Sequence, residues 1–151
     1  MIWSVRRGTL EDLPAIASLH RECFADAWDV EFLGRLLAQP GAFSVIALEQ
    51  GVPTGFLLAR VTAGEAEILS LGVRPSSRRR SWGTALVQDA LKDAFLAGAT
   101  EVFLEVSVEN AAARCLYGRL EFREVGLRPS YYSQGSGRRA DALILRRGPR
   151  D

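Results

Sequence analysis

The stretch Val73-Arg74-Pro75-Ser76-Ser77-Arg78-Arg79-Arg80-Ser81-Trp82-Gly83-Thr84 joins an apolar run to a long amphipathic segment. The run before it is of β type, and the segment after it predicts a helix from about Trp82 to Leu96. Unpaired N–H groups and the positive end of a dipole meet where such a helix begins. Gly83 permits close backbone approach there, and three arginines add positive charge. Two interpretations stay open: an anion site and a solvated basic turn.

The segments before this stretch predict an antiparallel meander. Three β-type runs cover residues 43–48, 55–61 and 66–73, and short turns that contain glycine separate them. Turns this short join antiparallel neighbours, since a parallel pair needs a long crossover. A short strand over residues 2–7 is expected before the meander, followed by a helix that opens at residues 9–12 and carries apolar residues up to Leu19, and by a second helix over about 29–38.

The segments after it predict a second group of strands with one helix. The expected elements are a strand over 101–108, a helix over 111–120, and closing strands over 122–127 and 140–145. Asn110 suits the N-cap of the helix, and Gly98 suits the C′ position of the long helix. A long loop with Tyr131 and Tyr132 is expected between the closing strands. The fold class is therefore mixed α/β, and one domain over residues 1–151 is expected.

Composition excludes several classes of protein. The chain has 151 residues, of which 48% are hydrophobic and 25% charged, so intrinsic disorder is excluded. No apolar run is long enough for a membrane span, and the first residues lack a secretory signal, so a cytoplasmic protein is expected. The net charge of +1 provides no general attraction for nucleic acid. Two distant cysteines, Cys23 and Cys115, are expected as free thiols, and a single histidine makes a metal site improbable.

Four polar or aromatic side chains are interpreted from the residues alone. Glu105 interrupts an apolar strand, so it is either a structural ion pair with an arginine or a general base. Asn110 is explained by helix capping alone, and Tyr117 by packing on a short helix. His20 is expected on the surface of the first helix.

Two segments resemble one known family. Residues 66–75 followed by Arg78-Arg79-Arg80-Ser81-Trp82-Gly83-Thr84 are similar to the acetyl-CoA segment of the GNAT acetyltransferases, whose loop reads Arg/Gln-x-x-Gly-x-Gly/Ala. Leu104-Glu105-Val106 and then Asn110-x-x-Ala-x-x-Leu-Tyr117 resemble the ribosomal-protein-alanine N-acetyltransferase branch. Phe24, Trp28 and Tyr131-Tyr132 extend the resemblance to nearly the whole chain.

The resemblance implies a fold, a co-substrate and a set of site residues. It implies a mostly antiparallel central sheet with a splayed strand pair and flanking helices, and it implies acetyl-CoA without a metal. Glu105 is implied as general base and Tyr117 as the acid that protonates the leaving thiolate. Trp28, Tyr131 and Tyr132 are implied as walls of the acceptor site. The implied contacts of the cofactor are Leu71, Gly72, Val73, Arg78, Arg79, Arg80, Ser81, Trp82, Gly83, Thr84 and Asn110.

The chain departs from the family pattern at four positions. Ser81 stands where the first loop glycine is expected, and Glu121 stands where glycine usually ends the second helix. If Ser81 needs a positive φ, it carries strain of roughly 1–2 kcal/mol. Trp82 is bulky for its place, and Ser107 replaces an arginine that is common in the branch. These departures bear on the affinity for the cofactor and on the acceptor pocket.

The resemblance implies acetyl transfer to a protein N-terminus, with the N-terminal alanine of a small-subunit ribosomal protein as acceptor. Three alternatives remain. The chain acts on another protein or small-molecule amine within the same family, or it is a CoA-binding or partner-binding module with little catalysis. A nucleic-acid-binding module is the third, and the near-zero net charge opposes it.

Overall fold

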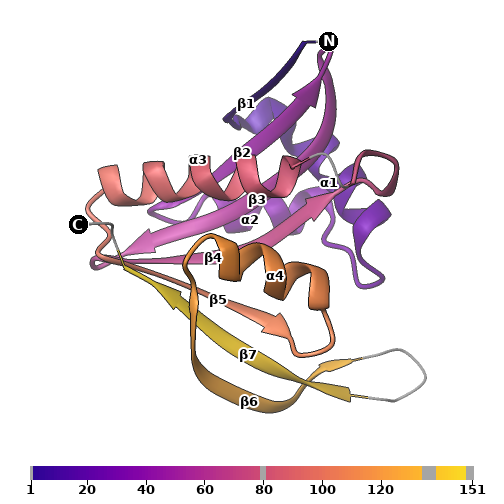
Figure 1. Ribbon diagram of the computed structural model, residues 1–151. Coiled ribbons are helices and arrows are strands. Elements are labelled where there is room, and N and C mark those ends of the chain that lie inside the picture. Colours follow the sequence, from indigo (N-terminus) through magenta and orange to yellow (C-terminus); the bar gives the residue numbers. More distant parts are fainter. Residues whose placement is uncertain (1, 79–80, 134–138, 149–151) are drawn as a thin grey trace.

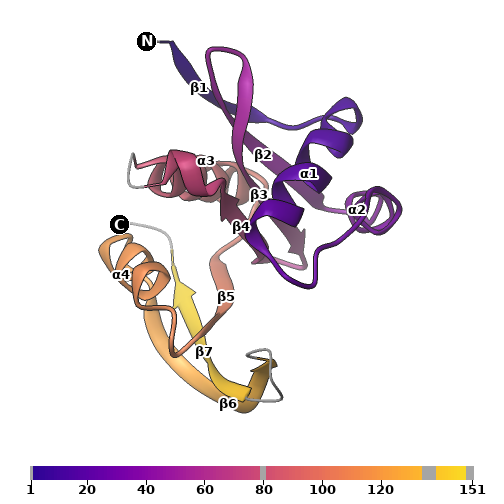
Figure 2. The same cartoon turned by 90° about the vertical axis from the view of Figure 1, so that its right-hand side faces the viewer.

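The computed structural model describes residues 2–78, 81–133 and 139–148, without the side chains of 130–133 and 139. It shows a seven-stranded sheet with helices on both faces (Figures 1 and 2). The elements are β1 (Trp3–Arg7), the 3₁₀ helix η1 (Leu10–Asp12), α1 (Leu13–Cys23), α2 (Val30–Leu37), β2 (Ala42–Glu49), β3 (Val52–Thr62), β4 (Glu65–Val73), the 3₁₀ helix η2 (Pro75–Ser77), α3 (Trp82–Leu96), β5 (Glu101–Ser107), α4 (Ala111–Arg119), β6 (Arg123–Ser133) and β7 (Arg139–Arg147). This confirms the predicted mixed α/β class.

Strands β2, β3 and β4 form the predicted antiparallel meander, and β1 extends it beside β2. Their order is β1-β2-β3-β4, and every neighbouring pair in it is antiparallel. The β3–β4 pairing shifts by one residue, because Leu58 pairs with Ser70 while Ala59 pairs with Ile68. Leu69 is therefore the extra residue of a β-bulge, a feature that re-aims neighbouring side chains.

The sheet opens between β4 and β5. These strands are parallel and pair only from Glu65–Glu101 to Glu67–Phe103, at the end where β4 begins. Beyond that point β4 continues to Val73 beside β3, while β5 continues beside β7. Figure 1 shows the two strands diverging toward their carboxyl ends. The splayed strand pair implied by the resemblance is thus present.

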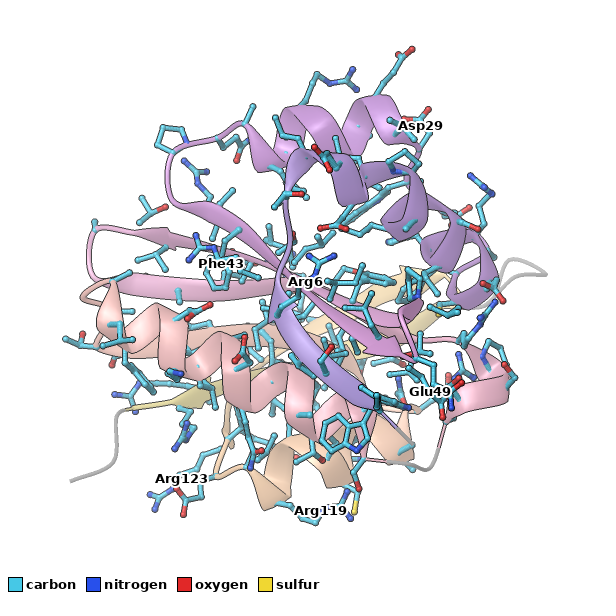
Figure 3. All side chains as sticks on the ribbon, turned by 90° about the horizontal axis from the view of Figure 1, so that it is seen from above. Arg6, Asp29, Phe43, Glu49, Arg119 and Arg123 are labelled. Carbon is cyan, nitrogen blue, oxygen red and sulfur yellow. The ribbon has the colours of Figure 1, made fainter. Side chains whose placement is uncertain are left out.

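Alternating residues of the meander feed two apolar layers. Val45, Ala47 and Leu57 face α3, and the intervening Ile46 and Phe56 face α1 and α2. All five are essentially inaccessible to solvent. Figure 2 shows α3 on one side of these strands and α1 and α2 on the other, so the sheet is covered on both faces in this half. Seen from above, Asp29 beside α2 and Arg119 on α4 lie at opposite sides of the molecule (Figure 3).

Local signals place most helix ends as predicted. The long helix runs from Trp82 to Leu96, and Gly98 follows it with φ of +97°. The Asn110 side chain accepts a hydrogen bond from the Ala113 N–H at 3.1 Å, so the predicted N-cap is confirmed.

The closing strands are longer than predicted. Tyr131 and Tyr132 lie in β6 and not in a long loop, and Tyr132 pairs with Ala140 of β7. Gly-, Pro- and Ser-containing sequence around them indicated a loop, but pairing with β7 outweighs weak local β preference.

Two residues that replace family glycines adopt left-handed backbone. Ser81, the N-cap of α3, has φ of +64°, and Glu121, just after α4, has φ of +70°. A side chain in this region costs roughly 1–2 kcal/mol relative to the right-handed region. Both departures noted in the sequence therefore introduce backbone strain.

Glu121→Gly is expected to stabilise the fold relative to Glu121→Ala. Both variants lose the contact of Glu121 with Arg147, whose closest N–O distance is 3.7 Å, but only glycine relieves the positive φ. Relief of roughly 1–2 kcal/mol exceeds the roughly 0.4–1 kcal/mol that glycine adds to unfolded-chain entropy. Urea unfolding should show glycine more stable than alanine by about 1 kcal/mol. Equal stabilities would contradict the assignment of strain.

Candidate active site

A groove of about 710 Å³ lies at the start of α3, beside the carboxyl end of β4. By helix geometry the N–H groups of the first turn of α3 have no partner inside the helix. Of the residues implied as cofactor contacts, those that line this groove are Leu71, Gly72, Val73, Arg78, Ser81, Trp82, Gly83, Thr84 and Asn110. Arg79 and Arg80 lie outside the described residues. We name this the β4–α3 groove; its donors and positive charge fit a phosphate-bearing ligand.

Close packing shapes the β4–α3 groove. The Nε of Arg78 donates to the Val73 carbonyl at 2.9 Å, which holds the loop against the end of β4. A Cβ on Gly83 would lie 3.2 Å from a methyl of Leu116, so glycine lets α3 approach α4. A Cβ on Gly72 would lie 2.7 Å from the Phe56 ring, a distance that packed cores do not accommodate. Two of the groove's residues thus have structural reasons to be glycine.

A second groove, of about 470 Å³, lies at the opening between β4 and β5. It is lined by Glu105 and Tyr117, and by Trp28 from the α1–α2 connection. The residues that line both grooves are Phe24, Leu71, Asn110 and Ala113, so the two grooves meet. We name the second one the β4–β5 groove. The β4–α3 groove can hold a long ligand, and the β4–β5 groove can hold a second molecule. The reactive ends of the two molecules would touch where the grooves meet.

Glu105 on β5 borders the β4–β5 groove. Burial along β5 alternates, with Leu104 and Val106 buried and Glu105 on the other face, as predicted. Its Oε1 is 2.8 Å from an Nη of Arg128, and its side chain is 21% exposed. Glu105 also lines a further groove of about 520 Å³ that Arg128 and Arg60 border. The predicted ion pair with an arginine is therefore present, and it holds the Glu105 side chain at the edge of the β4–β5 groove.

Tyr117 is buried at the inner wall of the β4–β5 groove. It is 5% exposed, and its ring meets Phe122 edge-on with centroids 5.4 Å apart. The packing interpretation is thus satisfied, and Tyr117 also lines the groove that contains Glu105. Of the implied acceptor residues, Trp28 lines this groove, whereas the side chains of Tyr131 and Tyr132 lie outside the described part.

His20 is buried, and the prediction of a surface position is wrong. It is 3% exposed, its ring stacks on Trp28 with centroids 4.8 Å apart, and it lines the β4–β5 groove. Its Nδ1 accepts the Trp28 backbone N–H at 3.1 Å, and its Nε2 is 3.3 Å from the Ser70 Oγ. Helical spacing from the buried Ile16 was a signal for this position, since i and i+4 share a face. No sequence signal singled out Ser70.

The cysteines are free thiols, as predicted. Cys115 is exposed, and Cys23 borders the β4–α3 groove. Burial raises the pKa of the Cys23 thiol, which lowers its thiolate fraction and hence its reactivity. In the described ranges no three His, Cys, Asp or Glu side chains gather as a metal site would require, and no helix there is long and apolar enough to cross a bilayer.

Comparisons with known proteins agree with this geometry. Residues 13–122 match the profile of the Acetyltransferase (GNAT) family. N-alpha-acetyltransferase RimI of Mycobacterium tuberculosis is 35% identical over 95% of this chain and 90% of its own. The crystal structure of the ribosomal-protein-S18-alanine N-acetyltransferase of Escherichia coli superposes with a TM-score of 0.89 at 26% identity, covering 96% of this chain and 92% of that one. NAA60 of Arabidopsis thaliana in complex with acetyl-CoA shares the fold, with a TM-score of 0.85 at 21% identity over 97% and 98% of the two chains.

The fold, the two meeting grooves and these relationships define an acetyl-CoA-dependent N-acetyltransferase. The chain belongs to the Acetyltransferase (GNAT) family. The alternative of a CoA-binding or partner-binding module with little catalysis is thereby set aside.

Stability should depend on pH through His20. Burial lowers the pKa of His20 below its ordinary 6.5, so in the acidic range the unfolded chain binds more protons than the folded one. The free energy of unfolding then has its full His20 contribution above about pH 6.5 and loses it as pH falls.

The measurement compares urea unfolding of wild type and His20→Phe at about pH 7.5 and about pH 5. Wild type should lose more stability on acidification than His20→Phe, which keeps a ring in the aromatic cluster. Equal losses would show that His20 protonates alike in the folded and unfolded states.

Proposed function

We propose that this chain transfers the acetyl group of acetyl-CoA to the α-amine of a protein N-terminus, and that the acceptor is the N-terminal alanine of a small-subunit ribosomal protein. The main support is the position of Glu105, which Arg128 holds in the groove that meets the β4–α3 groove at Leu71 and Asn110. The ribosomal acceptor is supported by the similarity to the ribosomal-protein-S18-alanine N-acetyltransferase of Escherichia coli, whose structure superposes over nearly the whole chain.

The proposed reaction is direct transfer within a ternary complex. The amine nitrogen attacks the thioester carbonyl carbon, the C–S bond breaks, and an amide and a free thiol result. Glu105 takes the proton that the amine loses, directly or through a water molecule, and Tyr117 gives a proton to the departing sulfur. Backbone N–H groups of β4 polarise the carbonyl, since β4 has left its ladder with β5 at this point. Neither cysteine is needed as a nucleophile.

The remaining predicted residues bind the two substrates in this proposal. Arg78, Arg79 and Arg80 add positive charge around the pyrophosphate, and the N–H groups from Ser81 to Thr84 donate to it. Asn110 adds a contact to the pantetheine arm while it caps α4. Trp28, Tyr131 and Tyr132 form walls of the acceptor site.

An α-amine suits a single carboxylate better than a lysine amine does. With a pKa near 8, an α-amine is neutral about one time in ten at pH 7. A lysine amine with a pKa near 10.4 is neutral in only about 0.04% of molecules. Because only the neutral amine attacks, Glu105 has much less deprotonation to perform at a protein N-terminus.

The acceptor is tested with acetyl-CoA and three peptides. One copies the alanine N-terminus of the small-subunit ribosomal protein, one starts with a different residue, and one has a blocked N-terminus and a free lysine. Mass and free thiol are followed together. Acetylation of the alanine peptide alone is expected. Equal rates on both free N-termini would favour a broader N-alpha-acetyltransferase, like the N-alpha-acetyltransferase RimI of Mycobacterium tuberculosis. Modification of the lysine alone would overturn the proposal.

Glu105→Gln should lower kcat by about 100-fold at neutral pH while acetyl-CoA binding stays the same, because general bases contribute roughly 10²–10⁴-fold. Glu101→Gln is the matched control, since Glu101 lies on the same face of β5 and pairs with Arg146 away from the two grooves. The comparison separates lost chemistry from a lost ion pair. Normal turnover in Glu105→Gln, or an equal loss in Glu101→Gln, would remove Glu105 from the role of base.

A further inference from the structure

A directed chain of hydrogen bonds runs from the α1–α2 connection to the β4–β5 groove. The Trp28 backbone N–H donates to Nδ1 of His20 at 3.1 Å, and Nε2 lies 3.3 Å from the Ser70 Oγ. A backbone N–H is only a donor, so Nδ1 must carry a lone pair. The hydrogen of a neutral imidazole is then on Nε2, which donates to Ser70. The direction of the chain is set by the backbone of Trp28.

Ring packing holds His20 in this orientation. Its ring lies within 4.6 Å of the Phe24 ring and 5.4 Å of the Phe56 ring, measured between centroids, and it stacks on Trp28 at an interplanar angle of 19°. Burial lowers the pKa of His20, which favours the neutral form at physiological pH. The imidazole therefore has one tautomer and one position.

This arrangement leaves the hydroxyl hydrogen of Ser70 directed away from His20. The Ser70 Oγ makes no other hydrogen bond with any residue that the structure describes. Ser70 lines the β4–β5 groove together with Glu105, and it is not among the residues that line the β4–α3 groove. The bulge at Leu69 is what puts both Leu69 and Ser70 toward α1, since a regular strand would alternate them. The acceptor side of the site thus presents an oriented O–H donor.

The peptide α-amine carries a matching acceptor. Its nitrogen is bonded to the α-carbon, which bears the carbonyl group of the first residue, whereas a lysine amine has only methylene groups around it. A polar group fixed in a partly buried groove discriminates strongly against a partner that cannot hydrogen-bond to it.

We propose that Ser70, oriented by His20, donates a hydrogen bond to the carbonyl oxygen of the acceptor's first residue and so selects a peptide α-amine over an alkyl amine. Ser70 is the specificity-determining residue, and His20 is a positioning residue that acts through it. This inference rests on the proposed function and deepens it.

The test compares Ser70→Ala with wild type on two acceptors. One is the alanine peptide of the proposed assay, and the other has its first peptide bond replaced by a trans-alkene, which keeps the shape and removes the carbonyl. Ser70→Ala should lower kcat/KM for the normal peptide by about 3- to 10-fold, the range of one hydrogen bond, and leave the alkene analogue unchanged. His20→Phe should show the same selective loss. Ser18→Ala, an equal change at an exposed site of α1, is the control.

Equal losses on both acceptors, or no loss on the normal peptide, would overturn the role of Ser70. Failure of wild type to acetylate any free N-terminus would instead overturn the proposed function, and this inference with it.

A second readout is independent of activity. His20 is the single histidine, so ¹⁵N NMR of protein without a histidine tag reports on it alone. A protonated Nε2 and an unprotonated Nδ1 at neutral pH are expected; the opposite tautomer or an imidazolium would overturn the hydrogen-bond chain.

Discussion

The loss of pairing between β4 and β5 is the constraint on which the site depends. These strands pair over only three residues, and each then follows a different neighbour. Where the pairing of β4 with β5 stops, backbone N–H and C=O groups of β4 have no partner on β5. Such groups cost free energy when they are buried unpaired, so they are available to a ligand. Both grooves follow from this opening: one continues to the start of α3, and the other faces Glu105. The active site is therefore a gap in the sheet, bordered by helix ends.

Two local departures from regular backbone lie beside the same gap. Ser81 at the start of α3 has positive φ and lines the β4–α3 groove, and Leu69 forms a bulge in β4 and lines the β4–β5 groove. Each costs free energy that the packed layers on both faces of the sheet must offset. Gly72 and Gly83 add close approaches that a larger residue would disturb. The features that weaken the fold locally are also those that shape the grooves.

The charged and polar groups of the site differ in how they are held. Glu105 is held by Arg128 from β6, the edge strand of the sheet, at 2.8 Å. His20 is held by a backbone hydrogen bond from Trp28 and by ring packing. Burial among the rings lowers the pKa of His20 and favours its neutral form. One side of the β4–β5 groove therefore has a carboxyl group held by an arginine, and the other has an oriented neutral donor.

The sequence by itself determined the elements and the family. Apolar periodicity, Asn110 and Gly98 placed the long helix and the capped short one, and the loop pattern around Gly83 identified the superfamily, because these signals are local. Only the tertiary structure decided that Tyr132 pairs in a strand, that Arg128 is the partner of Glu105, and that His20 is buried against Trp28. These outcomes depend on strand register and on helix–sheet packing. Register and packing join residues far apart in the chain, which no local pattern specifies.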